Sequence, residues 1–199
     1  MFTGNLAATL LMRTERTAAD AARISFVTAV AVADTVAGFT PDSLVSLKWP
    51  NDVLLDGRKV CGILIESGRI GRTDALWLAI GIGVNVARAP TDVDRPATAI
   101  ADHLREDVPR SPAASVVLDH LADAFARRLA QWDRFGWTSI ADAWTARAIG
   151  IGGPCTARLD NETIDGQAEG LDEDGALRLR LADGTVRRIS AGDVFFGRG

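Results

Sequence analysis

The stretch that most constrains the fold runs from Ser46 to Glu66, with the sequence SLKWPNDVLLDGRKVCGILIE. It predicts a strand that ends at Lys48, followed by a hairpin with its tight turn at Asp56-Gly57. Asp-Gly between two apolar runs is a strong short-range hairpin signal, because glycine accepts the positive φ that such turns require. Lys48 is therefore expected at the end of a buried strand, beside a rigid turn.

A charged lysine in that position needs an anionic partner, because burying an unpaired charge is costly or shifts its pKa strongly. Asp52 is one candidate partner, and a carboxylate or phosphate of a ligand is another. Taken alone, a lysine at a strand end is more often simply solvated. Lys48 therefore indicates a functional site only in combination with the motifs around it.

A second informative stretch is the near-continuous apolar run from Ala75 to Val86, ALWLAIGIGVNV, which predicts a central strand. Its glycines, Gly81 and Gly83, weaken a strand, and close approach of a ligand to the backbone is one reason to keep them. A bulge or tight helix packing explains them equally well. Asn85 adds a polar group that could orient a ligand in an apolar pocket.

The remaining elements predicted before residue 150 are one strand and three helices. A strand is predicted over Gly4–Met12, and a capping box formed by Thr17 and Asp20 begins a helix that ends near Ala37. Ser111-Pro112 begins a helix that runs to about Phe135. A short helix is expected from Ser139 to Ala148. The pattern indicates an α+β domain.

The clearest boundary is the glycine-rich segment from Gly150 to Pro154, beyond which apolar residues alternate with a period of two. We therefore expect one domain over residues 1–149 and a small SH3-like β-barrel over residues 150–199. Four arginines of this region could meet an acidic partner protein, although a solvated strand face is the simpler explanation: Arg178, Arg180, Arg187 and Arg188.

Composition excludes several classes of protein. A net charge of −4 and a pI near 5.2 argue against a general nucleic-acid binder, and no helix-turn-helix is recognisable. The longest apolar helical run, Ile24–Ala33, is too short to cross a bilayer, and no signal peptide is evident. The two cysteines, Cys61 and Cys155, are expected to be buried free thiols, as is usual in a reducing cytoplasm. No metal-ligand spacing is present.

Three motifs together indicate a family. Lys-Trp-Pro-Asn-Asp at residues 48–52, Gly-Ile-Leu-Ile-Glu at 62–66 after the hairpin, and Gly-Ile-Gly-Val-Asn-Val at 81–86 resemble, in order and spacing, the catalytic domain of biotin protein ligases. The resemblance runs from about Gly4 to the C-terminus. It implies a mixed sheet flanked by helices, followed by an SH3-like barrel.

The resemblance also implies an activity. Such an enzyme uses ATP, with Mg²⁺, to activate biotin as biotinoyl-5′-AMP, and then transfers it to a lysine of the biotin carboxyl carrier protein of acetyl-CoA carboxylase or a related carboxylase. A lipoate ligase is less consistent with the motifs, since Lys-Trp-Pro-Asn-Asp is absent from that family's pattern. We expect a cytoplasmic protein that binds neither DNA nor membranes and could form a homodimer.

Site residues follow from the motif positions. The resemblance implies that Lys48 contacts the biotin carboxylate and the α-phosphate, while Asp52 and Asn51 hold the lysine and the turn or assist Mg²⁺. Gly81, Gly83 and the pair Gly62-Ile63 would let biotin lie against the backbone, and Asn85 would lie near the adenine. Trp49 is expected to be a core residue.

The sequence departs from the family's pattern at its start. Family members carry an arginine- and glycine-rich loop, GRGRxGRxW, before the Gly-Asn-Leu strand, and a Ser/Thr-rich segment ahead of it. This chain begins Met1-Phe2-Thr3-Gly4 and has neither. We expect either a longer native protein with a misassigned start, which we favour, or a truncated protein that binds nucleotide or carrier protein with impaired catalysis. The chain as written is expected to bind biotin weakly.

Overall fold

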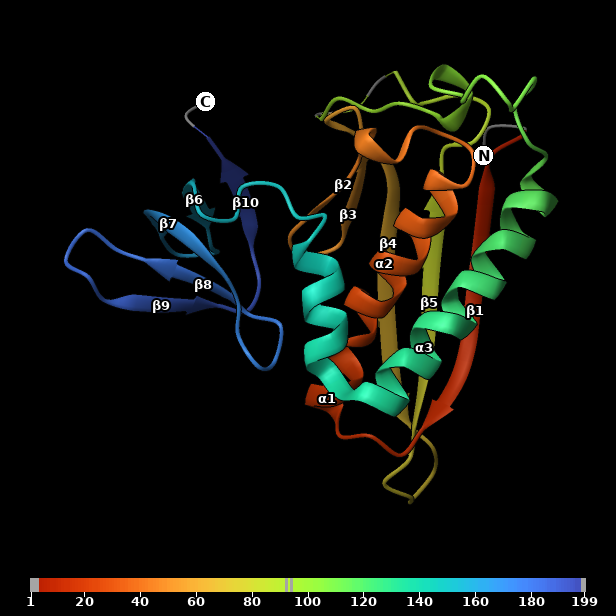
Figure 1. The fold of residues 1–199 in the computed structure, drawn as a ribbon. Coiled ribbons are helices and arrows are strands. Elements are labelled where there is room, and N and C mark those ends of the chain that lie inside the picture. Colours follow the sequence, from red (N-terminus) through yellow and green to blue (C-terminus); the bar gives the residue numbers. More distant parts are fainter. Residues whose placement is uncertain (1–3, 92, 94, 198–199) are drawn as a thin grey trace.

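The computed structural model describes residues 4–91, 93 and 95–197, so the predicted departure at Met1–Thr3 lies outside it. Its larger unit is a five-stranded sheet in the order β1-β5-β4-β3-β2 (Figure 1). The strands are β1 (Leu6–Thr14), β2 (Val45–Lys48), β3 (Asp52–Leu55), β4 (Arg58–Arg69) and β5 (Leu76–Val84). The α+β class is confirmed, but the expected mixed sheet is not: every ladder of this sheet is antiparallel. In the part of the chain that the structure describes, parallel pairing is limited to two isolated bridges.

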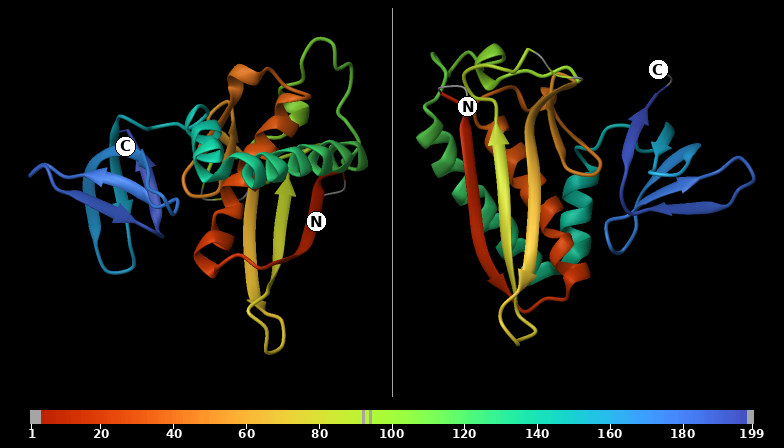
Figure 2. Two further views of the ribbon diagram at one scale, coloured as in Figure 1. Left: turned by 60° about the horizontal axis from the view of Figure 1, so that its bottom comes forward. Right: turned by 180° about the vertical axis from the view of Figure 1, so that it is seen from behind.

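Helices cover one face of this sheet and leave the other open (Figures 1 and 2). They are α1 (Ala18–Ala22), α2 (Ile24–Ala37) and α3 (Ala114–Thr145), with the 3₁₀ turns η1 (Asp42–Leu44) and η2 (Ile100–Asp102). The Ala- and Val-rich α2 is buried on almost every side, because it lies between the sheet and α3. Among the described residues, no helix is both long and apolar enough to cross a membrane.

Most predicted elements are confirmed, with one difference. The helix that begins at the Thr17 cap is interrupted at Arg23 and ends at Gly38 as expected. The two helices predicted before and after residue 136 are confirmed as the two helical parts of α3, which are separated by a kink at Gly136, where φ is 76° and ψ is −176°. Only glycine adopts that conformation readily, so Gly136 marks the point at which the apolar stripe changes direction.

The C-terminal unit is a second antiparallel sheet, in the order β10-β6-β7-β8-β9. Its strands are β6 (Pro154–Arg158), β7 (Thr163–Leu171), β8 (Leu177–Arg180), β9 (Val186–Ile189) and β10 (Asp193–Phe196). The period-two pattern is confirmed, since Leu177 and Leu179 are fully buried while Arg178 and Arg180 are exposed. The described ladders do not close this SH3-like sheet into a barrel.

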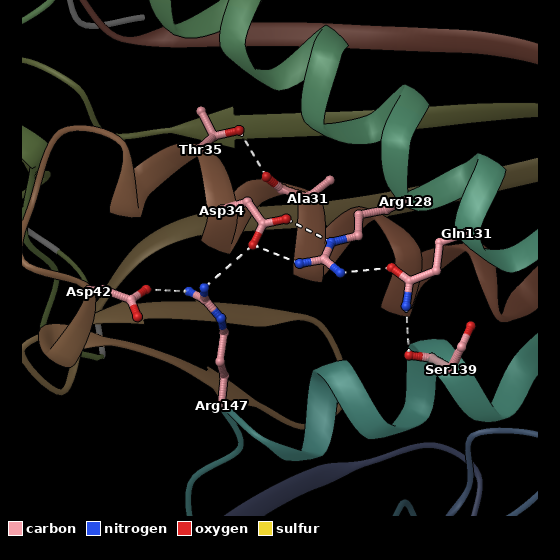
Figure 3. A network of polar contacts seen from close by, with 8 residues as sticks. All are labelled: Ala31, Asp34, Thr35, Asp42, Arg128, Gln131, Ser139 and Arg147. Carbon is pink, nitrogen blue, oxygen red and sulfur yellow. Dashed lines mark hydrogen bonds and ion pairs between the residues drawn. The ribbon is translucent and has the colours of Figure 1, made fainter. Parts of the chain in front are cut away.

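A polar network ties the helical layer to the end of α3 (Figure 3). The Asp34 carboxylate accepts hydrogen bonds from Nε and Nη2 of Arg128, at 2.7 and 3.0 Å, and lies 3.4 Å from Nη2 of Arg147. Arg147 also pairs with Asp42 of η1 at 2.9 Å. The carbonyl of Arg147 accepts a hydrogen bond from the amide of Leu47, the residue before Lys48. The network therefore fixes the strand that carries Lys48.

The two sheets meet beside the Lys-Trp-Pro-Asn-Asp turn. Trp49 is 2% exposed, as predicted for a core residue, but its indole Nε1 also donates a 3.0 Å hydrogen bond to the carbonyl of Gly175 in the C-terminal unit. The C-terminal unit is thus held against the strand end at Lys48.

Candidate active site

A cavity of 670 Å³ opens at the ends of β4 and β5. Three of the predicted site residues line it, Gly62, Gly83 and Asn85, together with Lys59 and Arg95. No acidic side chain of the described residues lines this cavity. Its chemistry is therefore that of an anion-binding site with an apolar floor.

Lys59 is the cation at the centre of the site. Its Nζ forms an ion pair with Asp52, whose carboxylate is almost fully buried and also lies 3.6 Å from Nη1 of Arg95. To reach Asp52, the lysine stem crosses over Gly62, where a Cβ would be only 3.4 Å from Cε of Lys59. Gly62 and Asp52 are register partners on neighbouring strands. Gly62 thus leaves room for the lysine as well as for a ligand.

Lys48 lies in an adjoining cavity of 360 Å³, between the two sheets. Lys59, Arg95 and Asp52 also line it, whereas Gly83 and Asn85 do not. The predicted pairing of Lys48 with Asp52 is replaced by the pairs of Asp52 with Lys59 and Arg95. Burial, followed by the positive charge of Arg95, lowers the pKa of Lys48 below its ordinary value, against the opposing effect of Asp52. Lys48 is therefore a half-buried cation that faces a cavity.

The glycines lie on the open face of the sheet, which is turned toward the viewer in the right-hand view of Figure 2, and Gly62 and Gly83 line the 670 Å³ cavity. Gly62 pairs with Gly83 across the β4–β5 ladder, and Gly81 pairs with Leu64. A Cβ at Gly83 would meet nothing within 4 Å, so no protein atom requires a glycine there. Close approach of a ligand remains an explanation, and the sequence-based alternatives of a bulge or helix packing do not apply at Gly83.

Asn85 is held in place by residues that the motifs did not reveal. Its Nδ2 donates to the carbonyl of Thr98 at 3.1 Å, and the amide of Thr98 donates to the carbonyl of Lys59 at 3.0 Å. The buried Thr98 hydroxyl lies 3.2 Å from Oδ2 of Asp102 and 3.0 Å from Nε2 of His103. His103, which has no recognisable role in the sequence, therefore belongs to the shell that positions Asn85 and Lys59.

Two predicted site residues lie elsewhere. The side chain of Ile63 faces the helix-covered side of the sheet, because successive residues of a strand point to opposite faces. It lines a separate cavity of 270 Å³ together with Asn51, whose Nδ2 donates to the Ile63 carbonyl at 2.8 Å. The structure does not bring Asn51 and the Ile63 side chain together with Lys59 and Asn85.

The comparisons with known proteins decide the family. Two family models match: "Biotin/lipoate A/B protein ligase family" over residues 2–85 and "Biotin protein ligase C terminal domain" over residues 150–197. A biotin--[acetyl-CoA-carboxylase] ligase of Paracoccus denitrificans is 41% identical over 196 residues, which cover 98% of this chain and 81% of that protein. The chain belongs to the biotin protein ligase family.

Other family members agree with this assignment. A biotin--[acetyl-CoA-carboxylase] ligase of Mycobacterium tuberculosis is 34% identical over 174 residues, 86% of this chain and 61% of that protein. The chain thus spans about three fifths of that longer relative. The crystal structure of biotin protein ligase from Aquifex aeolicus has a TM-score of 0.78 at 21% identity, covering 98% of this chain and 83% of that one, and it shows the shared fold.

In this member of the biotin protein ligase family, the sequence motifs pointed to Lys48 and Asp52 but not to Lys59, which pairs with Asp52. Lys59 follows the Asp56-Gly57 turn by two residues, and the hairpin register alone places it near Asp52. The hairpin register was therefore the signal from which the pairing of Lys59 with Asp52 could have been predicted. Arg95 lies in a loop without periodicity, and no pattern predicted its contact with Asp52.

The four C-terminal arginines follow the simpler of the two predictions. Each has a carboxylate within its own sheet: Arg178 and Arg180 pair with Glu169, Arg187 pairs with Glu162, and Arg188 pairs with Asp172 and Asp174. Their positive charge is compensated locally, as expected of a solvated strand face. Both cysteines are buried and free, as predicted.

Proposed function

We propose that this chain activates biotin with ATP to form biotinoyl-5′-AMP and then transfers the biotinoyl group to a lysine of a biotin carboxyl carrier protein. The observation that carries the proposal is the Lys59 side chain, which crosses Gly62 and reaches the buried Asp52 at the junction of the two cavities. Members of the family carry this activity in their names. The chemistry of the site agrees with it.

The first step joins two anions. A biotin carboxylate oxygen attacks the α-phosphorus of ATP, the bond from that phosphorus to the bridging oxygen breaks, and pyrophosphate leaves. The two reactants repel one another, so positioned cations lower the barrier most effectively. Lys59 and Arg95 line both cavities and Lys48 lines one, which gives three cations where the reactants would meet. Asp52 holds two of them in place.

The same geometry suggests where each part of the substrates binds. The open sheet face along Gly62, Gly83 and Gly81 would let an extended apolar ligand lie against the backbone, which suits biotin. Asn85 lines the same cavity as Gly62 and Gly83 and suits the adenine. Within the two cavities, Asp52 is the one described carboxylate, so Mg²⁺ would be held mainly by ATP phosphates and water, as is usual for this ion. When bound, it would neutralise phosphate charge.

In the second step, the amine of the acceptor lysine attacks the acyl carbon of biotinoyl-AMP. The carbon–oxygen bond to AMP breaks, AMP leaves with the electron pair, and the amine loses a proton. We propose the carrier protein of acetyl-CoA carboxylase or a related carboxylase as the acceptor. The division at residues 149/150, a cytoplasmic location, a homodimer and the lack of DNA binding are also parts of this proposal.

The test is pyrophosphate release from biotin and ATP, together with transfer of labelled biotin to a carrier domain. We expect Lys59→Met to lower the rate by about 10²–10³-fold, since removing one group that stabilises developing charge has an effect of this order. Arg69→Met is the matched control, because Arg69 is an exposed cation at the far end of the same strand. Equal rates in the two variants would overturn the role of Lys59.

The alternative function, ligand binding with impaired turnover, gives a different result. The wild-type chain would then bind ATP or carrier protein but release no pyrophosphate above background. The open face of the sheet is the observation that favours it, since Leu11 and Leu64 are 78% and 67% exposed there. Binding and turnover measured on one preparation separate the two functions.

A further inference from the structure

Asn5, the residue before β1, holds the chain that follows Asn85. Its Oδ1 accepts hydrogen bonds from three consecutive amides, those of Val86, Ala87 and Arg88, at 3.0, 3.0 and 3.3 Å. Its Nδ2 donates to the carbonyl of Arg88 at 2.8 Å. One carboxamide thus makes four hydrogen bonds to a segment that lies more than eighty residues away in the sequence.

Gly4 permits the close approach of these two segments. A Cβ at Gly4 would lie 2.9 Å from the Cβ of Ala87, and the φ of 94° at this residue favours glycine. The side chain of Val86 is fully buried, so the contacted segment starts from a fixed point in the core. The contact of Asn5 is therefore part of a close junction between the start of β1 and the end of β5.

The segment held by Asn5 leads into one wall of the 670 Å³ cavity. Four described residues further along the chain form this wall: Pro90, Val93, Arg95 and Ala97. Asn85, directly before the segment, lines the same cavity. Asn5 itself is not among the described residues that line it. Any effect of Asn5 on a ligand would therefore pass through the wall.

The two ends of the wall are fixed in different ways. At the far end, the amide of Lys59 donates to the carbonyl of Pro96 at 2.9 Å, and the amide of Thr98 donates to the carbonyl of Lys59 at 3.0 Å. At the near end, within the part of the chain that the structure describes, the main-chain hydrogen bonds of residues 87–88 go to Asn5. The near end therefore depends on a single side chain, whereas the far end depends on main-chain groups.

We propose that Asn5 is a positioning residue for the adenine nucleotide, because it fixes the near end of the cavity wall beside Asn85. The identity of the ligand rests on the proposed function. A wall that is already ordered spares the bound nucleotide the entropic cost of ordering it, so Asn5 raises affinity without touching the ligand. Lys59 is held separately, by its ion pair with Asp52, so the bond-making step depends less on Asn5.

Binding of ATP to the full chain in the absence of biotin tests this role separately from turnover. Calorimetry is expected to show that Asn5→Ala weakens ATP binding by about tenfold, through the loss of the anchoring hydrogen bonds. Asn5→Asp keeps an oxygen that accepts from the three amides, so it is expected to bind ATP within about threefold of the wild type. In turnover, Asn5→Ala is expected to raise the KM for ATP with little change in kcat.

Thr17→Ala is the matched control for general destabilisation. Thr17 accepts a 3.1 Å hydrogen bond from the amide of Asp20 and caps α1, at the opposite end of the sheet from the cavity (Figure 1). Its loss is expected to lower the melting temperature and to leave ATP affinity unchanged.

Hydrogen–deuterium exchange locates the effect in the chain. The amides of residues 86–88 are expected to exchange faster in Asn5→Ala than in the wild type or in Asn5→Asp. Wild-type ATP affinity in Asn5→Ala, an equal loss of affinity in Thr17→Ala, or no recovery in Asn5→Asp would each overturn the positioning role. The expected order of ATP affinities without any adenylate formation would instead refute only the proposed function.

Discussion

At the residue scale, the candidate site depends on its glycines as much as on its charged side chains. Gly62 gives Lys59 a path to Asp52, and Gly83 leaves an open floor beside it. The sequence motifs contain both glycines and Asp52, because these residues lie in contiguous stretches. The sequence did not show Arg95 or Thr98, because both lie in a loop without periodicity, and the contacts of Arg95 with Asp52 and of Thr98 with Lys59 join separate segments.

The proposal that biotin lies against the backbone glycines can be tested at Gly83. We expect Gly83→Val to raise the KM for biotin by tenfold or more, because the new side chain would occupy the space where the ligand lies. The protein itself has no atom within 4 Å of the added Cβ, so the melting temperature should change little. Steady-state kinetics and thermal unfolding measure the two effects. A normal KM for biotin would show that the ligand binds elsewhere.

Thr98 is predicted to position the site without touching a substrate. Thr98→Val keeps the shape of the buried side chain but removes the hydroxyl that contacts Asp102 and His103. Leaving those partners unsatisfied costs about 1–3 kcal/mol. We expect a higher KM for ATP with a smaller change in kcat, since Thr98 orients Asn85 through its carbonyl.

Thr28→Val is the matched control for Thr98. Thr28 is equally buried, and its hydroxyl donates a 2.7 Å hydrogen bond to the carbonyl of Ile24 within α2. We expect Thr28→Val to alter stability but not the KM for ATP. If both variants shift KM equally, the effect reflects general destabilisation and not positioning.

Lys48 gives the site a dependence on pH. Its pKa is lowered by burial and by Arg95, so it loses its charge at a lower pH than an ordinary lysine, and pyrophosphate binding should weaken as pH rises through that value. Arg95, Lys59, Asp52 and Asp193 also face it, and the Cys155 thiol nearby has its pKa raised to about 11. Lys48→Arg should retain binding at alkaline pH, because a guanidinium stays charged. Parallel pH profiles for the two proteins would contradict this assignment.

At the scale of elements, the sequence predicted most strands and helices because their signals are local. Alternation marked the C-terminal strands, and the Asp56-Gly57 turn has the positive φ values, 52° and 70°, that the hairpin signal requires. The sequence indicated the bend of α3 as a break between two predicted helices, on either side of Gly136. The sheet order was not predictable, because antiparallel and parallel pairing depend on contacts between distant segments.

The bend at Gly136 is a test of that element. We expect Gly136→Ala to lower the free energy of unfolding by about 1–3 kcal/mol, because the φ and ψ of this residue are strained for any side chain. Urea denaturation measures the change. Gly83→Ala is the control, since its backbone lies outside the left-handed region and its Cβ has no close neighbour. A loss at Gly83 as large as that at Gly136 would exclude backbone strain as the cause.

At the scale of the whole molecule, the sequence predicted two units but not how they join. The glycine-rich segment after Ile149 marked a change of pattern, whereas the docking contacts connect residues more than a hundred positions apart, such as Trp49 and Gly175. This docking brings the ring centroid of Phe195 to 5.5 Å from Nζ of Lys48. Fixing the C-terminal unit is therefore predicted to be part of substrate binding.

Trp49 offers the most direct test of the docking. Trp49→Phe keeps an aromatic core residue but removes the indole Nε1 and leaves the buried carbonyl of Gly175 without its donor. An unsatisfied buried acceptor costs about 1–3 kcal/mol. We expect faster proteolysis between residues 149 and 153 and weaker pyrophosphate binding, because the C-terminal unit would be less firmly held against the Lys48 strand.

Trp144→Phe is the matched control, because it removes the same side-chain atoms as Trp49→Phe. Trp144 is as deeply buried as Trp49, but its Nε1 has no hydrogen-bond partner among the residues that the structure describes. The two variants leave cavities of similar size, so their difference isolates the hydrogen bond between the units. We expect Trp144→Phe to leave pyrophosphate affinity and cleavage at residues 149–153 near wild-type values. If the two variants behave alike, the contact between Trp49 and Gly175 does not couple the C-terminal unit to the site.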